Sequence, residues 1–247
     1  QKYLIGARWY PYRGTSLDMG GYYKRNQYND SFPVDSTANS AGSADTYPGY
    51  LTMQGFQTWD GNLRLTVRPI LKLTLVTRYE YQLSTIDTTP DAASGLSGLQ
   101  SSQMTSHILG QNVSWSPWSR LCLQAGFNYV LSETKTPAAD YTQAILNSQN
   151  NYWTVTFNSS VVLNDKTDLN VTYLYYRAAD FNNNASAGLP LGAGAEEHSV
   201  TATLVHRINE HLRVSLKGAW SHYNDWASGG NSNYDAAMVY STLQYRF

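Results

Sequence analysis

Basic side chains recur at alternate positions in several segments of this 247-residue sequence. Alternate residues of a β-strand point to one face, so basic residues with this spacing would gather on the same side of a strand. A space lined by Lys and Arg attracts anions and can select them during passage. We therefore predict an anion-attracting, lumen-lining surface made of Arg64, Arg68, Lys72, Arg78, Arg120, Arg207, Arg213 and Lys217.

Acidic residues on the same predicted faces are fewer, chiefly Asp18 and Glu80, with Asp168 at a predicted turn. Most other acids lie in predicted loops, for example Asp87, Asp91, Asp140, Asp180, Glu196 and Glu197. A formal net charge of -1 therefore combines basic strand faces with an acidic loop region. The competing interpretation is that many of the basic residues are solvated charges near turns and have no effect on a solute.

No residue spacing indicates catalysis or metal binding. The five histidines lack a metal-ligand spacing, and Glu196-Glu197-His198 is better explained as a solvated loop end than as a metal site. A single cysteine, Cys122, rules out an intrachain disulfide, and we expect a buried, inert thiol. We predict no catalytic residue, no metal and no cofactor. The formal net charge says nothing about a nucleic-acid partner, the sequence has no basic tail, and we predict no such partner.

Alternation of apolar and polar residues marks the elements that must position these side chains. The clearest stretch is Leu71–Ser84, where Leu, Thr and Tyr at odd positions alternate with mostly polar residues at even ones. Similar patterns predict about eleven strands in all. The others cover Tyr3–Tyr10, Leu17–Tyr23, Tyr50–Val67, His107–Trp115, Leu121–Leu131, Trp153–Leu163, Leu169–Tyr175, Val200–Ile208, Leu212–Trp220 and Ala237–Phe247.

The predicted strands are joined alternately by short turns and long polar loops. Pro11–Gly14 and Asn164–Lys166 are short turns, whereas Asn26–Pro48 and Phe181–Ala195 are long loops. Strands of roughly 10 residues suit a tilted crossing of a lipid bilayer, and no run approaches the roughly 18 apolar residues of a spanning helix. Charged residues make up only 14% of the chain, which is low for a soluble domain. A secreted β-sandwich is the alternative fold.

Aromatic residues cluster at both ends of the predicted strands. One group lies near the short turns and another near the long loops, as expected for two aromatic girdles at membrane interfaces. The first group is Trp9, Trp115, Trp118 and Tyr245, and the second is Tyr79, Tyr81, Tyr129, Tyr175 and Trp220.

The final stretch places Val239, Leu243, Tyr245 and Phe247 on one face of a strand. A terminal Phe with an aromatic two residues earlier resembles the closing strand of Gram-negative outer-membrane β-barrels, although Ser241 departs from the usual apolar residue. In that family, this segment is the signal read by the barrel assembly machinery. The resemblance implies an all-β chain whose single domain, residues 1–247, is a transmembrane antiparallel up-and-down β-barrel in the lipid of the bacterial outer membrane.

Strand parity indicates that more strands exist than this sequence supplies. With about eleven strands, Tyr3–Tyr10 would run parallel to the terminal strand, whereas single-chain bacterial barrels have an even number of antiparallel strands. We therefore expect about 11–12 visible strands that form the C-terminal part of a larger barrel. The alternative is a misassigned hairpin between Asn26 and Asp60.

Together with the predicted basic faces, the resemblance favours a passive, anion-leaning diffusion channel, or porin, and the lack of a catalytic motif predicts no enzymatic activity. An alternative is a structural sheath around a periplasmic or surface protein, such as the multihaem cytochrome of a porin–cytochrome conduit. The Arg68-Pro69 turn followed by the Leu73–Tyr81 strand loosely resembles such sheaths. A third possibility is an active transporter, which would need an N-terminal plug domain.

Overall fold

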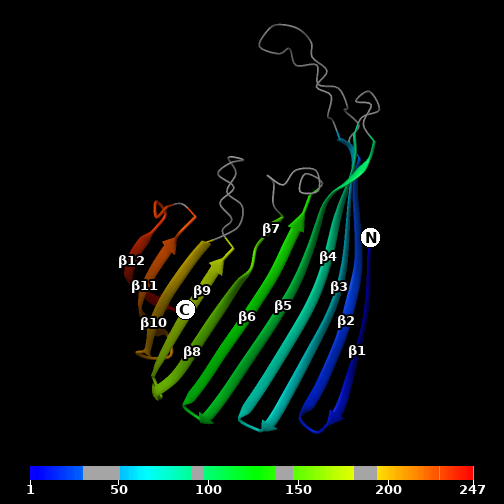
Figure 1. Ribbon diagram of the computed structural model, residues 1–247. Helices are drawn as coiled ribbons and strands as arrows, with labels where there is room; N and C mark the ends of the chain where they lie inside the picture. The colour runs from blue at the N-terminus through cyan, green and yellow to red at the C-terminus, as the bar shows by residue number, and fades with distance from the viewer. Residues whose placement is uncertain (30–50, 91–96, 137–146, 181–193, 228, 247) are drawn as a thin grey trace.

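A computed structural model describes residues 1–29, 51–90, 97–136, 147–180, 194–227 and 229–246, most of which lie in one antiparallel β-sheet (Figure 1). Its long strands follow one another in chain order, and the short β7 pairs with the end of β6. The strands are β1 (Lys2–Tyr12), β2 (Thr15–Asn29), β3 (Leu51–Ile70), β4 (Leu73–Pro90), β5 (Leu99–Trp118), β6 (Leu121–Lys135), β7 (Ser148–Gln149), β8 (Tyr152–Asn164), β9 (Thr167–Ala179), β10 (Gly194–Arg207), β11 (Leu212–Asp225) and β12 (Tyr234–Tyr245). The described residues include no helix that is long and apolar enough to cross a membrane.

Short turns and long connections lie at opposite ends of the strands, as the sequence predicts. Residues 13–14, 71–72, 119–120, 165–166 and 208–211 connect strands at one end, which we call the short-turn end. The strands extend beyond the predicted boundaries at the other end. β5, for example, begins at Leu99 rather than His107, because its first residues are mostly polar and lack the apolar alternation that marks the strand.

The register aligns the apolar faces of neighbouring strands. Phe157 of β8 lies opposite Ala125 of β6 on one side and Tyr173 of β9 on the other. Tyr173 in turn lies opposite Val200 of β10, which faces Trp220 of β11. Because side chains alternate between faces, this register places the apolar rows on one side of the whole sheet and the polar rows on the other.

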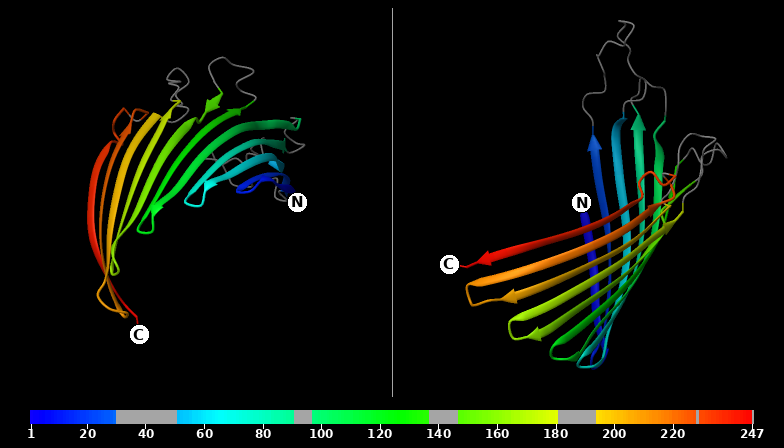
Figure 2. Two further views of the ribbon diagram at one scale, coloured as in Figure 1. Left: turned by 90° about the horizontal axis from the view of Figure 1, so that it is seen from below. Right: turned by 90° about the vertical axis from the view of Figure 1, so that its left-hand side faces the viewer.

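The sheet curves into an open trough (Figure 2). Side chains converge on the concave side of such a sheet, and the buried residues other than glycine all belong to the polar face, which is therefore the concave one: Asp60, Thr88, Ser106, Val130, Ala178 and Ala195. Large apolar side chains on the convex face remain exposed, including Trp9 (58%), Leu216 (50%) and Val239 (74%). No second layer of described residues covers them, which excludes a sandwich and is the arrangement expected where lipid covers the sheet.

The convex face carries aromatic pairs toward the long-connection end. Tyr23 and Trp59 have ring centroids 4.3 Å apart, and Trp153 and Tyr175 are 4.7 Å apart. Tyr81 lies 5.0 Å from His107. Aromatic side chains of this kind are enriched at the boundary between hydrocarbon and headgroups, so their location agrees with the predicted outer girdle.

The two edge strands do not meet within the described part of the chain. β1 pairs only with β2, and β12 pairs only with β11 (Figure 2). Every described pairing is antiparallel, and the path from β1 to β12 contains an odd number of strands because β7 lies off it. The two edge strands therefore run in the same direction. Joining β1 to β12 would therefore create a parallel pair, as the parity of the sequence pattern predicts.

A charged residue should be tolerated on the concave face and not on the convex face. Val113 lies on the convex face of β5, and Ser114 is its neighbour on the concave face. We expect Val113→Arg to destabilise the protein in lipid by about 2–4 kcal/mol, because Arg would face hydrocarbon between the two aromatic girdles. Ser114→Arg is the matched control and should stay near wild type. Equal losses in a urea titration of protein folded in lipid vesicles would contradict the assignment of faces.

The glycines that face each other across β2 and β3 should respond differently to a methyl group. A Cβ on Gly21 would lie 2.6 Å from the backbone oxygen of Asp60, whereas a Cβ on Gly61 would meet nothing within 4 Å. We expect Gly21→Ala to cost about 1–3 kcal/mol, because the backbone must shift to relieve the contact. Gly61→Ala should be neutral in the same unfolding measurement. A neutral Gly21→Ala would show that the two strands are less closely spaced.

Candidate functional site

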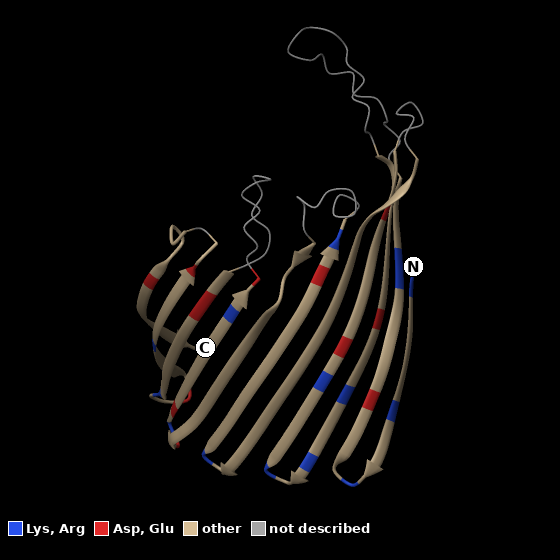
Figure 3. Cartoon of the chain, in the orientation of Figure 1, with Lys and Arg blue, Asp and Glu red and all other residues tan. Residues whose placement is uncertain are grey.

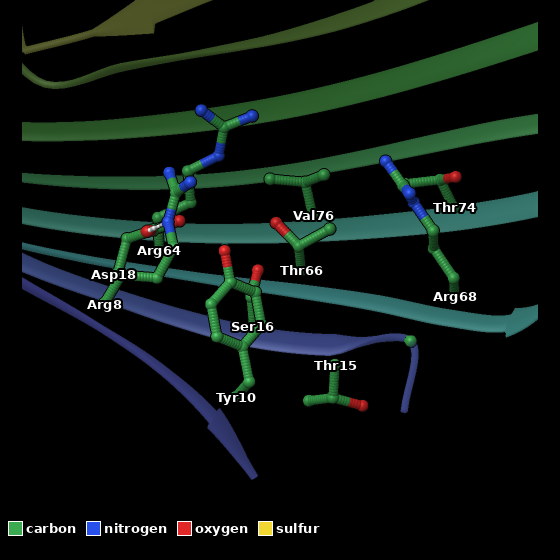
Figure 4. A pocket seen from close by; sticks show the side chains of 11 residues that line it. Arg8, Tyr10, Thr15, Ser16, Asp18, Arg64, Thr66, Arg68, Thr74 and Val76 are labelled. Carbon is green, nitrogen blue, oxygen red and sulfur yellow. Dashed lines mark hydrogen bonds and ion pairs between the residues drawn. The ribbon is translucent and has the colours of Figure 1, made fainter. Parts of the chain in front are cut away.

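Basic side chains line an open groove on the concave face of β1–β4 near the short turns (Figure 4). The groove has a volume of about 460 Å³, and its lining includes Arg8 of β1 with Arg64 and Arg68 of β3. Hydroxyl groups of Tyr10 and Thr66 also line it. The groove therefore combines guanidinium and hydroxyl donors, which are suited to binding an anion.

Strand pairing and a tight turn position these arginines. Asp18 of β2 lies opposite Arg8 on one side and Arg64 on the other, and Arg64 lies opposite Arg78 of β4. At the turn, the backbone N–H of Arg68 donates to the carbonyl oxygen of Gly14 at 2.7 Å. Gly14 has a φ of 80°, and a Cβ there would lie 2.8 Å from the Arg68 oxygen, so glycine is required at this position.

The arginines of the groove differ in their partners. Arg8 forms an ion pair with Asp18. Within the described residues, Arg64 and Arg68 form no ion pair. Arg78 lies opposite Arg64 on β4, beyond the lining of the groove. The guanidinium groups of Arg64 and Arg68, which have no carboxylate partner among the described residues, are therefore available to bind a solute.

Several residues predicted to line the lumen lie instead at the short-turn end. Lys72 and Arg120 occupy two-residue turns, where Lys72 Nζ donates to the Pro117 carbonyl oxygen at 2.8 Å. Arg120 lies 3.5 Å from Asp165 across neighbouring turns. These two side chains therefore belong to the rim of the sheet rather than to its wall, a position that the competing interpretation of solvated turn charge describes better.

The remaining predicted residues lie on β10 and β11, away from the groove. Arg207 and Arg213 face each other where these strands meet, and Arg207 Nη2 lies 2.9 Å from Asp168 Oδ2. Lys217 lies further along β11, with its Nζ 5.6 Å from the ring centroid of Tyr240. The six predicted residues that lie on strands thus share one side of the sheet, but the eight together do not form a single cluster.

Charge is distributed unevenly along the strands (Figure 3). The short-turn end carries a set of basic residues that we call the basic rim: Arg13, Lys72, Arg120, Lys166, Arg207 and Arg213. Acids predominate toward the long connections, where Asp87, Glu133, Glu196, Glu197 and Asp235 lie. Asp87 belongs to β4, and Glu196 and Glu197 belong to β10, so their predicted assignment to loops is wrong, because the strands continue past the apolar alternation. Asp91 and Asp140, predicted to belong to the acidic loops, lie outside the described residues. A charged solute that passes along the sheet would meet different potentials at the two ends.

The sequence pattern did not indicate Asp60 as an acidic residue of the concave wall. Asp60 of β3 is only 8% exposed, and Asn62 Nδ2 donates to its Oδ1 at 2.9 Å. Glu197 and Asp225 also face the concave side, opposite Tyr223 and Ala195 respectively. Asp60 escaped notice because Gly55 and Gly61 replace apolar residues of β3 and weaken the alternation around it.

His198, considered as a metal ligand, and the thiol of Cys122 lie on opposite faces of the sheet. His198 lies on the convex face, where its Nε2 is 3.5 Å from Glu196 Oε1 and its Nδ1 is 2.9 Å from the Tyr173 hydroxyl oxygen. Cys122 is half-buried on the concave face, more exposed than the buried thiol that we expected. No group of three or more His, Cys, Asp or Glu in the described ranges is arranged to hold a metal ion.

The sheet resembles the walls of known outer-membrane proteins. The ferric citrate transporter FecA matches with a TM-score of 0.52 at 9% identity over 98% of this chain and 38% of its own. The copper transporter OprC matches with a TM-score of 0.51 at 10% identity over 98% of this chain and 49% of its own. The monoaromatic hydrocarbon channel CymD aligns over 99% of this chain and 74% of its own, with a TM-score of 0.40 and 10% identity. No protein-family model and no curated protein matches the sequence.

The chain has the fold of an outer-membrane β-barrel. Its antiparallel up-and-down strands, apolar convex face and division of short from long connections are those of this class, which resides in the bacterial outer membrane. The chain spans about half the length of OprC and about two fifths of FecA. The likeness to these two transporters concerns the fold alone.

The ion pairs of the concave face should contribute little to stability. The side chains of Arg8 and Asp18 are 60% and 26% exposed, and an exposed pair typically contributes no more than about 1 kcal/mol. We expect Asp18→Asn to change the free energy of unfolding by less than about 1 kcal/mol. Asp168→Asn, which removes the partner of Arg207, should behave alike. A larger loss for Asp18→Asn alone would indicate that the groove depends structurally on its ion pair.

Proposed function

We propose that this chain forms the wall of a water-filled diffusion channel in the outer membrane, with a preference for anions and no enzymatic activity. The supporting observation is the groove on the concave face, where Arg64 and Arg68 lack an acidic partner among the described residues. A passive channel needs a polar lumen that binds solutes weakly enough to release them. An open groove with unpaired guanidinium groups meets that requirement.

Physical complementarity supports the anion preference. A guanidinium group cannot lose its charge at physiological pH, and its planar donors match carboxylate and phosphate oxygens. Arg64, Arg68 and Arg78 lie on adjacent strands of one wall, so their potentials add over a short distance. Asp18, Asp60 and Glu80 on the same wall reduce this potential, so the preference is graded rather than absolute.

Neutralising these three arginines should weaken the selectivity. A unit charge about 4 Å from an ion contributes about 1 kcal/mol in water, so Arg64→Gln, Arg68→Gln and Arg78→Gln together should lower the ratio of chloride to potassium permeability about fivefold or more. The measurement is the reversal potential across a planar bilayer in a potassium chloride gradient. The native, full-length protein should be used for the recording.

The matched control is Arg25→Gln, since Arg25 occupies the convex side of β2 near the long connections. This variant should keep the wild-type permeability ratio. The proposal fails if the wild-type protein prefers cations strongly, or if the triple variant and the control shift the reversal potential equally.

A sheath around a periplasmic or surface protein is the second candidate function. The two unpaired edges and their common direction favour a cylinder with more strands than those described, which would be wide enough to enclose a partner. The basic rim would face an acidic protein at the short-turn end. A multihaem cytochrome is the partner class that the sequence resemblance implies.

The visible absorption spectrum of the natively purified complex separates the two candidates. A co-purifying haem band that survives moderate salt would support the sheath. A protein without a haem band that conducts ions in a bilayer would support the open channel.

Two further partners follow from the proposed location. Lipid of the outer membrane would cover the convex face, and the barrel assembly machinery would read the terminal strand. Val239, Leu243 and Tyr245 lie on the convex side of β12 with exposures of 74%, 68% and 57%. Phe247, the last residue of the predicted signal, lies outside the described residues.

A further inference from the structure

Two carboxyl groups lie close together on the concave wall, one step along the strands from the pair Arg64 and Arg78, which we call the arginine row. Asp60 of β3 lies opposite Gln82 of β4, and Asn62 lies opposite Glu80, so the two acids are diagonal neighbours across the strand pair. Two carboxylates in such positions repel each other unless a cation lies between them or one of them keeps its proton.

Asp60 is more than nine-tenths buried and only partly satisfied. Its Oδ1 accepts a hydrogen bond from Asn62 Nδ2, but its Oδ2 is buried without a hydrogen-bond partner. A buried carboxylate oxygen without a partner is costly, so its retention points to a ligand that the oxygen contacts. Asp60 forms no ion pair within the described residues, and Lys2 Nζ lies instead over the ring of Tyr22, 4.2 Å from its centroid.

The surroundings of the pair supply further oxygen ligands. Gln82 Nε2 donates to the Tyr22 hydroxyl oxygen at 3.0 Å, which leaves the Gln82 carbonyl oxygen as a potential ligand on the same cross-strand row as Asp60. Glu80 is close to the open concave side, so water can complete a coordination shell. Oxygen ligands from carboxylates, amides and water are those that Ca²⁺ prefers, and Ca²⁺ tolerates an irregular geometry.

We propose that Asp60 and Glu80 form a binding site for a hard divalent cation, Ca²⁺ in particular, with the Gln82 carbonyl oxygen and water as additional ligands. Asp60 Oδ2 and a Glu80 oxygen bind the ion from neighbouring strands. Arg78 offsets part of the acidic charge beside Glu80, so the site carries a net charge of about one negative unit before the ion binds. The bound ion links β3 and β4 at mid-strand.

Calcium binding to the full-length protein tests this site directly. The protein is refolded into detergent free of lipopolysaccharide, and Ca²⁺ binding is followed by titration calorimetry. Tb³⁺ luminescence sensitised by nearby tyrosine provides a second readout. We expect one Ca²⁺ per chain, with an affinity of about 10⁻⁴ to 10⁻³ M, the range of extracellular calcium modules.

Three variants distinguish this site from other acidic groups. Asp60→Asn and Glu80→Gln should each weaken binding at least tenfold, whereas Asp168→Asn should bind Ca²⁺ like the wild type because Asp168 is paired with Arg207. Glu80→Gln decides the question if Asp60→Asn fails to fold. The absence of Ca²⁺ binding by the folded wild type, or unchanged binding by Glu80→Gln, would overturn the proposal. Neither result depends on whether the protein conducts ions.

Discussion

The lack of water in hydrocarbon is the constraint on which this structure depends. Each backbone N–H and C=O group within a membrane must be paired inside the protein, so the strand register has to be continuous. The irregularities of register lie accordingly at the strand ends. Four are beside short turns, for example between Val67 and Ile70 and between Trp115 and Trp118, and two are near the long connections. The central parts of all strand pairs are regular.

Because the register is regular in the central part of each strand pair, the apolar residues of all strands lie on one face of the sheet and the polar residues on the other. A slip of one residue in any pair would send an apolar row to the concave side and a polar row into lipid. The bulges beside the turns absorb differences in strand length where water is available. Arg64 and Arg78, by contrast, lie in a regular part of the β3–β4 pair and are held opposite each other on the wall.

The sequence predicted the strands, their order and the separation of the faces, because alternation is strong wherever lipid contacts the sheet. The prediction of strand boundaries is poorer where lipid does not contact the sheet, because apolar residues are not required there. The beginning of β5 and the extension of β2 to Asn29 are polar on both faces, so the sequence resembles a loop there. Lys72 and Arg120 have the parity of wall residues, yet they lie within turns, because parity loses its meaning once the strand ends. Asp60 was missed because glycines on both sides interrupt the apolar row.

The spacing of charges on the concave wall decides how the wall acts on a solute. The arginine row and the Asp60–Glu80 pair are separated by two to four residues along the strands, roughly 7–13 Å at about 3.3 Å per residue. The Debye length is about 8 Å at physiological ionic strength, so salt only partly screens the electrostatic potential that one group of charges exerts on an ion beside the other group. The opposing charges on this wall therefore act together rather than as separate sites. Formal net charge alone conceals this arrangement, since it depends on which residues the register brings to the same face.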